Sequence, residues 1–332
     1  MYIFRRRALI FGAIASTTVL AFAAPKRNPQ PLTGAPALWQ DPVDIASRDL
    51  MYGAGGAANQ PRGTFKFVKE DLSGTNPKLV ISDSHGVKWK LKLGVEARPE
   101  TAASRLVWAA GYFTDEEYFL PDLKIDNVPA NLHRGANLIE PDGLTHNGRL
   151  KRYAKDEKDE GDWKWKENPF TGTREFNGLR VVMALINNWD LKDNNNKIIA
   201  RDGQQIYLVS DLGASFGSTG RSVTQTDSKG NAGVYSESKF IASVTPKGVN
   251  FNFPTRPALI NVFQLSDFVS RENMEWIGKN IPVADARWIG QILSRLSTRQ
   301  IEEAFATAGF SPKETGAFTA TIQARVAELN QL

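Results

Sequence analysis

Residues 188–196, with the sequence NWDLKDNNN, bring two carboxylates and several carboxamides into one short stretch. Carboxylates this close repel each other unless a cation or a proton lies between them. A third carboxylate, Asp211, begins the triplet Asp-Leu-Gly a little further along the chain. Metal-assisted phosphoryl transfer uses these residue types: one Asp handles the acceptor hydroxyl, while an Asn and a second Asp hold magnesium. Taken alone, the stretch also fits a solvated Asn/Asp turn.

Periodic apolar residues predict the elements that position these side chains. Residues 176–186 have a helical apolar stripe that leads into the stretch. Residues 197–200 and 205–210 flank an Asp-Gly turn and predict a hairpin, so Asp211 follows its second strand. Three further helices are expected in the C-terminal part, at residues 286–296, 298–308 and 315–329. An EF-hand calcium loop is excluded, because Ile198 occupies the position where that loop needs glycine.

The N-terminal half predicts an antiparallel meander followed by a helix. Residues 64–70, 79–83 and 87–93 have strand patterns and are separated by short turns. In the third strand three lysines alternate with Val87, Trp89, Leu91 and Leu93, so Lys92 lies on the face opposite the apolar one. A helix is expected at residues 101–113, with Glu100 at its start. The expected fold class is therefore α+β, and residues 151–166, which are densely charged, are expected to form a solvated loop.

The first 24 residues have the composition of a secretory signal, with three arginines, an apolar run and an Ala-Phe-Ala site. We expect the protein to be exported, periplasmic or secreted, and an uncleaved N-terminal anchor is the alternative. Removal of this segment lowers the formal net charge from +5 to +2, so the charge does not indicate a nucleic-acid partner. Residues 25–60 are expected to form a flexible leader.

Several classes of site are excluded by composition. The chain has no cysteine, which excludes disulfides and thiolate chemistry, and its three histidines lie far apart without metal-ligand spacing. A hydrophobic content of 41% over 332 residues is sufficient for one large domain or two lobes.

In this order, the motifs resemble the protein-kinase-like superfamily, and most closely the phosphatidylinositol kinases and the persistence-toxin kinases. Lys92-Leu93-Gly94, followed by Arg98 and Glu100, is similar to the lysine and acid pattern at the end of the third strand in the lipid-kinase group. The stretch from Asp190 to Asn195 is similar to the D-x-x-x-x-N catalytic loop, and Asp211 begins the counterpart of the metal-binding D-F-G triplet.

The resemblance implies a role for each of these residues. Lys92 would bind phosphate, Glu100 would pair with Lys92, Asp190 would be the catalytic carboxylate, and Asn195 with Asp211 would hold Mg²⁺. The fold implied is two-lobed, with an antiparallel β N-lobe at residues 61–150 and a mainly helical C-lobe at residues 151–332. Without the resemblance, Lys92 is equally compatible with one of three solvated lysines on a strand face, and Glu100 with an acid that caps its helix.

The sequence hypothesis is an exported kinase-like protein that transfers a phosphoryl group from Mg-ATP to an unknown protein or small-molecule acceptor. One alternative is a catalytically silent kinase-like domain that binds a ligand or partner in the cell envelope, because ATP is scarce outside the cytoplasm. Another is a secreted hydrolase with Asp190, Asp193 and Asp211 on a metal, for which the chain offers few further ligands.

Overall fold

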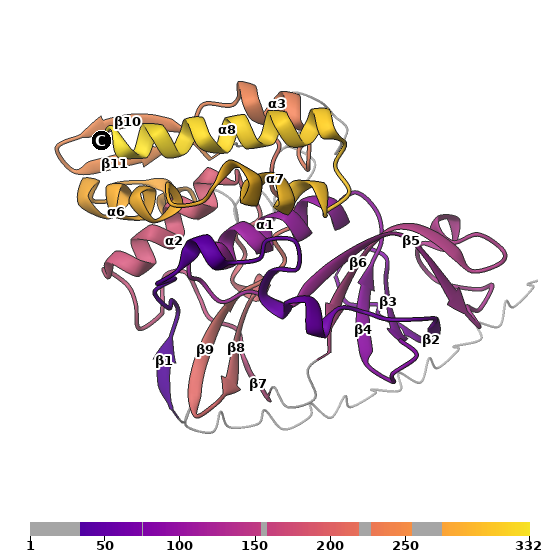
Figure 1. The fold of residues 1–332 in the computed structure, drawn as a ribbon. Coiled ribbons are helices and arrows are strands. Elements are labelled where there is room, and N and C mark those ends of the chain that lie inside the picture. Colours follow the sequence, from indigo (N-terminus) through magenta and orange to yellow (C-terminus); the bar gives the residue numbers. More distant parts are fainter. Residues whose placement is uncertain (1–33, 75, 154–157, 219–226, 254–273) are drawn as a thin grey trace, which may run out of the picture. The chain divides into compact units, whose positions relative to one another are not determined.

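Five strands in the N-terminal half close into a barrel, in the order β2-β3-β4-β6-β5. The computed structural model describes residues 34–74, 76–153, 158–218, 227–253 and 274–332 (Figure 1). The expected signal segment at residues 1–24 lies outside these ranges. The barrel strands are β2 (Phe65–Glu70), β3 (Lys78–Ser82), β4 (Lys88–Lys92), β5 (Glu117–Asp126) and β6 (Leu144–Arg152).

The register of the barrel places three cations side by side. Lys92 at the end of β4 pairs with Lys78 of β3 on one side and with Arg149 of β6 on the other. Alternate residues of β4, Trp89 and Leu91, are buried in the barrel core, as the alternation in the sequence predicts. The predicted meander of three strands is therefore confirmed, and its basic row follows from strand pairing.

Helix α1 (Ala97–Ala109) follows β4 after the turn at Gly94 and packs against both parts of the molecule. It contacts β5 and β6 of the barrel and α7 of the C-terminal helices (Figure 1). Leu106 and Val107 belong to the large helical core, whereas Glu100 is buried next to the barrel. Because α1 is held from both sides, it fixes the position of Glu100.

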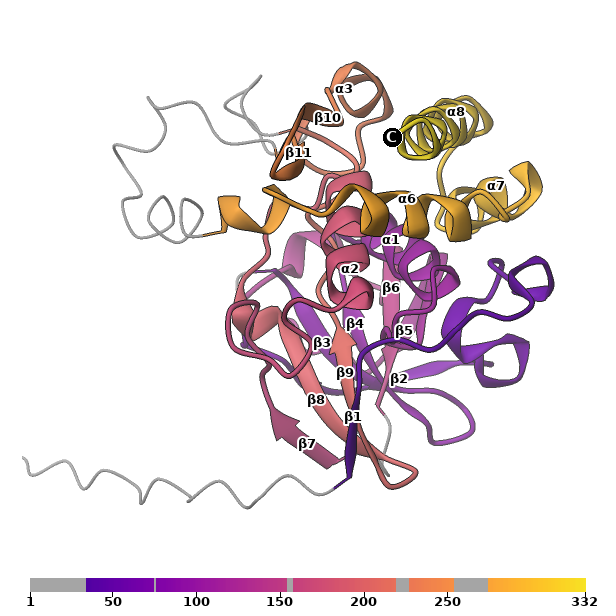
Figure 2. The same cartoon turned by 90° about the vertical axis from the view of Figure 1, so that its left-hand side faces the viewer.

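The rest of the molecule combines helices with a second sheet, in the order β1-β9-β8-β7, to which the N-terminal segment contributes β1 (Figure 2). The strands beyond the barrel are β1 (Ala35–Ala37), β7 (Lys158–Gly161), β8 (Asn196–Arg201), β9 (Gln204–Val209), β10 (Ile241–Thr245) and β11 (Gly248–Phe251). The α-helices are α2 (Arg174–Leu185), α3 (Ala232–Glu237), α6 (Val283–Leu293), α7 (Thr298–Ala306) and α8 (Pro312–Asn330). Short 3₁₀ turns are η1 (Ile45–Ser47), η2 (Gly53–Gly55), η3 (Ala57–Asn59), η4 (Ala136–Leu138), η5 (Asp193–Asn195) and η7 (Glu275–Gly278).

These elements confirm the predicted α+β, two-lobed fold class. The predicted hairpin is formed by β8 and β9, and the apolar stripe before residue 188 forms α2. Local capping supports the C-terminal helices: Ser297 with Gln300 and Ser311 with Glu314 each form a capping box. None of the helices in the described ranges has the length and apolar character needed to cross a membrane.

Two segments differ from the sequence expectations. Residues 34–60 are not a flexible leader, because β1 pairs with β9, and Leu38, Ile45 and Leu50 are buried in the helical core. The charged segment 151–166 is not simply a solvated loop, because Trp163 and Trp165 are each only 2% exposed. In both cases a few well-spaced apolar side chains outweigh a polar composition, since each fully buried one contributes about 1.5–3 kcal/mol.

Aromatic rings bind α7 and α8 to the loop that follows β9. Phe318 of α8 stacks on Phe305 of α7 at a ring-centre distance of 4.6 Å and lies 5.6 Å from Phe216. Phe216 is fully buried and lies five residues after Asp211. The cluster therefore holds one end of the Asp211 loop in the core.

We expect Phe318→Ala to lower the free energy of unfolding by about 3–5 kcal/mol, because it removes a fully buried ring from this cluster. Urea unfolding measures the change. Leu72→Ala, at a side chain that is 55% exposed, is the control and should change stability by about 0.5 kcal/mol or less. Equal effects of the two substitutions would contradict the packing described above.

Candidate active site

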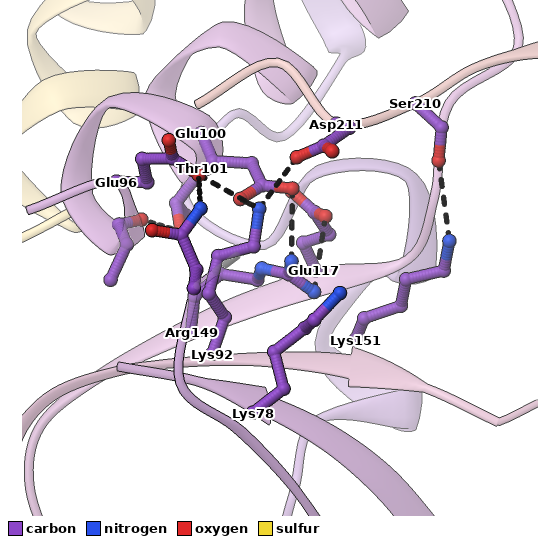
Figure 3. Close-up of polar contacts among 12 residues, drawn as sticks. Lys78, Lys92, Glu96, Glu100, Thr101, Glu117, Arg149, Lys151, Ser210 and Asp211 are labelled. Atoms are coloured by element: carbon purple, nitrogen blue, oxygen red, sulfur yellow. Dashed lines mark hydrogen bonds and ion pairs between the residues drawn. The ribbon is translucent and has the colours of Figure 1, made fainter. Parts of the chain in front are cut away.

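Lys92 lies at the centre of a cluster of charged side chains between the barrel, α1 and the Asp211 loop (Figure 3). Its Nζ is 2.7 Å from Glu100 Oε2, 2.6 Å from Asp211 Oδ1 and 3.2 Å from Glu96 Oε2. The lysine side chain is only 3% exposed. Three of the residues selected from the sequence, Lys92, Glu100 and Asp211, are thus brought into direct contact.

The charges of this cluster stabilise one another. Burial by itself would lower the pKa of Lys92, but Glu100 and Asp211 raise that pKa above its ordinary range. Burial would raise the pKa of Asp211, but the charge and hydrogen bond of Lys92 outweigh it and lower the pKa to about 2. Lys92 is therefore cationic and Asp211 is anionic at neutral pH.

Arg149 and Glu117 form the buried rear wall of the cluster. Arg149 donates to Glu100 Oε1 at 2.9 Å, and its other nitrogen lies 3.5 Å from Glu117 Oε1. Burial and the nearby charge of Glu100 together raise the pKa of Glu117 to about 8, against the opposing effect of Arg149. Arg149 thus contacts one carboxylate oxygen of Glu100, while Lys92 contacts the other.

The Asp-Leu-Gly triplet has the backbone and side chains that this close packing requires. Asp211 has a φ of 53°, in the left-handed region that aspartate tolerates better than most residues. Leu212 is buried in the helical core. A Cβ at Gly213 would lie 2.7 Å from Glu96 Cβ, so only glycine allows the loop to approach α1 this closely.

Glu96, Glu100 and Asp211 have the donor set of a divalent-cation site. One carboxylate oxygen from each lies within 4.8 Å of the others. Magnesium prefers oxygen ligands and is commonly held by one or two carboxylates together with substrate phosphates. Lys92 and Lys78, which approaches from β3, supply cations for phosphate oxygens (Figure 3). These residues fit Mg²⁺ with a nucleotide phosphate group.

Asp190 lies on a loop that is joined to the segment after Asp211. The backbone N–H of Trp189 donates to the carbonyl of Ala214 at 3.2 Å, and that of Phe216 donates to Ile186 at 2.8 Å. Asp190 is paired with Lys192 at 3.2 Å and is partly exposed. The loop and the triplet are therefore neighbours, although Asp190 makes no ion pair with Lys92 in the described part of the chain.

Asn195, for which the resemblance implies a role as a metal ligand, lies at the end of the Asp190 loop. Its amide donates to the Asp190 carbonyl at 2.7 Å and so closes the loop. Within the described residues it forms no hydrogen bond with Asp211, whose carboxylate neighbours are Glu96 and Glu100. Asp193 accepts from the Trp165 backbone N–H at 3.0 Å and also shapes the turn.

Arg325 of α8 anchors the base of the Asp190 loop. Its guanidinium donates to the Leu185 carbonyl at 2.7 Å and to Asn187 Oδ1 at 3.0 Å. The Asn187 amide donates to the Gly217 carbonyl at 2.9 Å. One buried arginine thereby links the end of α2 and both loops of the candidate site.

Sequence reasoning did not identify Glu96, Arg149 or Lys229 as part of the site. Glu96 lies one helical turn before Glu100, a spacing that places both carboxylates on one face of α1. Arg149 becomes visible only when β6 is paired with β4, which needs the tertiary structure. Lys229 reaches Glu96 Oε1 at 2.5 Å from a Gly- and Ser-rich segment that has no strong pattern of its own.

The pairing of the strand lysine Lys92 with the helix glutamate Glu100 is what the kinase-like resemblance implied, within a two-lobed fold. The direct contact of Asp211 with Lys92 is an addition that the structure makes to that expectation. No protein-family model matches the sequence, and a search of the curated proteins gives no match. The chain is similar in structure to the Helicobacter pylori proinflammatory kinase CtkA, with 9% identity and a TM-score of 0.42, over 80% of this chain and 93% of the other.

The chain is also similar in structure to two structures of the Golgi casein kinase, one of which has Mn/ADP bound. Each has 9% identity and a TM-score of 0.41 and covers 82% of this chain. The match covers 72% of the kinase chain in the structure with Mn/ADP and 71% in the other.

We expect Lys92→Met to lower the free energy of unfolding by about 3–5 kcal/mol, since it leaves buried carboxylates without their shared cation. Lys90→Met is the matched control, because Lys90 lies on the same strand, is 37% exposed, and contacts only Asp71 at 3.7 Å and the Tyr153 ring at 5.3 Å among the residues described. Urea unfolding of both variants at neutral pH checks this. A Lys92 variant as stable as the Lys90 variant would show that the cluster contributes little to stability.

Glu117 should make stability depend on pH. Its folded-state pKa of about 8 lies above its ordinary value of 4.5, so in this interval only the folded state binds the proton. The contribution is favourable at low pH and is lost progressively as the pH rises from 4.5 to about 8. As the pH rises through this interval, the free energy of unfolding of Glu117→Gln should therefore increase relative to that of the wild type. Unfolding at several pH values measures this difference. The exposed Glu302→Gln control should show no such trend, and a flat difference for Glu117→Gln would contradict the prediction.

Proposed function

We propose that this chain is an exported kinase-like phosphotransferase that uses Mg-ATP and transfers a phosphoryl group to an acceptor hydroxyl. The observation that supports this most strongly is the buried Lys92 ammonium, held between Glu100 at 2.7 Å and Asp211 at 2.6 Å. A bound Mg-ATP would supply the phosphoryl group, and the cation would neutralise part of its charge.

The residues of the cluster have separate roles in this proposal. Lys92 binds phosphate oxygens and is oriented by Glu100, which Arg149 holds in turn at 2.9 Å. Asp211 and Glu96 would hold the divalent cation, and Glu100 belongs to the same group of carboxylates. Asn195 keeps the Asp190 loop closed through its 2.7 Å hydrogen bond and thereby positions Asp190. Little covalent chemistry is required of the protein, so these positioning and charge effects supply most of the catalysis.

Asp190 is the candidate to accept the proton of the acceptor hydroxyl. It is partly exposed, on the loop joined to the Asp211 segment through Trp189 and Ala214. Its pairing with Lys192 at 3.2 Å keeps a cation close to the carboxylate. In this proposal the acceptor is either a protein or a small molecule.

One observation favours the second candidate, a catalytically silent kinase-like domain that binds a ligand or partner in the cell envelope. Every carboxylate of the cluster is already in contact with a lysine or arginine of the chain, and Glu96 contacts two lysines. A site that is neutralised by its own side chains binds a metal less readily than an unpaired one.

Calorimetric titration with Mg-ATP separates the two candidates. The wild-type protein should bind Mg-ATP, and Asp211→Ala should weaken binding by about tenfold or more, since one charge-assisted contact contributes about 1.5–3 kcal/mol. Lys90→Met should bind as the wild type does, because Lys90 lies outside the cluster. Absence of binding to the wild type would contradict the phosphotransferase proposal and support the silent domain.

If Mg-ATP binds, Asp190→Ala should retain nucleotide affinity and lose transfer by about 10²–10⁴-fold, the usual contribution of a general base. Formation of ADP in the presence of candidate acceptors measures transfer. Lys192→Met is a useful companion variant, because it removes the partner of Asp190 and leaves the carboxylate. An Asp190 variant with unchanged transfer would exclude this residue as the base.

A further inference from the structure

Lys229 extends into the carboxylate cluster from the segment that follows the Asp211 loop. Its Nζ is 2.5 Å from Glu96 Oε1, and its side chain is only 7% exposed. The sequence patterns do not point to this residue, and the phosphotransferase proposal does not use it. A buried lysine aimed at a candidate metal ligand therefore needs an explanation of its own.

The backbone around Lys229 is fixed against the Asp211 loop. Gly230 N–H donates to the Ser215 carbonyl at 2.9 Å, and Asn231 N–H donates to the Phe216 carbonyl at 2.7 Å. The Trp189 indole donates to the Ser228 carbonyl at 2.9 Å. Residues 228–231 thus remain next to the site whether or not the lysine side chain contacts Glu96.

Glu96 is saturated by cations and donors of the chain. Its Oε1 contacts Lys229, while its Oε2 contacts Lys92 at 3.2 Å and accepts from the Asn76 amide at 2.6 Å. Burial would raise the pKa of Glu96, but Lys92 and Lys229 outweigh it and lower that pKa. A divalent cation can use Glu96 Oε1 only after the Lys229 ammonium has left it.

The two lysines differ in how readily they can leave. Lys92 contacts all three carboxylates, whereas Lys229, among the residues that the structure describes, has an ion pair with Glu96 alone. The Lys229 ammonium also lies 5.6 Å from the centre of the Trp189 ring, whose face attracts cations. Rotation of the long flexible side chain moves the ammonium away from Glu96 while the backbone stays in place.

Charge balance favours an exchange over an addition. Glu96, Glu100 and Asp211 carry three negative charges, and Lys92, Arg149 and Lys229, which are paired with them, carry three positive charges. If Lys229 stayed, a divalent cation would leave two excess positive charges at low exposure, which is costly. Departure of the Lys229 ammonium halves this excess, to which Lys78 nearby also adds.

We propose that Lys229 is a built-in competitor for the divalent cation: its ammonium occupies Glu96 in the metal-free protein, and the metal displaces it to bind. The proposal rests on the metal site of the proposed function. It adds that access of the metal to Glu96 is gated by a residue of the same chain, and it predicts that the wild type binds the metal more weakly than a variant without the Lys229 ammonium.

Binding of Mn²⁺ alone tests this without any enzymatic assay. The electron paramagnetic resonance signal of the free ion measures how much Mn²⁺ stays unbound. Lys229→Met should bind Mn²⁺ at least about fivefold more tightly than the wild type, the lower range of typical coupling between two ligands. Lys247→Met removes an exposed lysine outside the cluster and should bind as the wild type does. Lys229→Gln replaces the Met variant if that variant does not fold.

A double-mutant comparison distinguishes competition at Glu96 from a general loss of positive charge. In the Glu96→Gln background, Lys229→Met should no longer strengthen Mn²⁺ binding, because the shared ligand is gone. An equal gain in both backgrounds would overturn the competition. If wild type and Lys229→Met bind Mn²⁺ with equal affinity and Asp211→Asn loses binding, the competition is overturned as well. That result would still support the metal site. Absence of Mn²⁺ binding in every variant would overturn the metal site itself.

Discussion

The buried ammonium of Lys92 is the constraint on which the arrangement of this protein depends. A charge that is 3% exposed is stable only if anionic groups surround it closely, and here they come from α1 and from the Asp211 loop. Those elements in turn need firm supports. Helix α1 is held between the barrel and α7, and the loop is anchored by Phe216 in the aromatic cluster. Barrel, helix and loop therefore meet at one cation, and displacement of any one leaves charges unpaired.

Much of the fold follows from local pattern, and the sequence is most informative where the period is clear. The alternation around Trp89 and Leu91 predicts β4, and the apolar stripe of residues 176–186 predicts α2. Patterns are less informative where a few residues outweigh the composition, as with Ile45 and Leu50 in the expected leader. Pairing between strands that are far apart in the chain is not visible either, so Arg149 of β6, a neighbour of Lys92 across the sheet, could not be predicted.

The same limit applies to the candidate site. Lys92, Glu100 and Asp211 can be selected from motif order, because each lies at the end or start of an element. Asn195 is a different case: its spacing from Asp190 suits a metal ligand, but the hydrogen bond from its amide nitrogen to the Asp190 carbonyl, which closes the loop, cannot be predicted from spacing. Glu96 and Lys229 enter the site through close approach of segments far apart in the chain, which Gly213 permits.

The clamp made by Arg325 has a consequence for the order in which the site is assembled. Residues 92–211 supply Lys92, Glu100, Asp190 and Asp211, but the buried guanidinium that joins Leu185, Asn187 and Ser238 comes from α8, close to the C-terminal end of the sequence. The barrel and α1 do not depend on that arginine, whereas the base of the Asp190 loop gains these hydrogen bonds once α8 has docked. A chain in which α8 has not yet docked therefore carries the charged residues without the full support of the site.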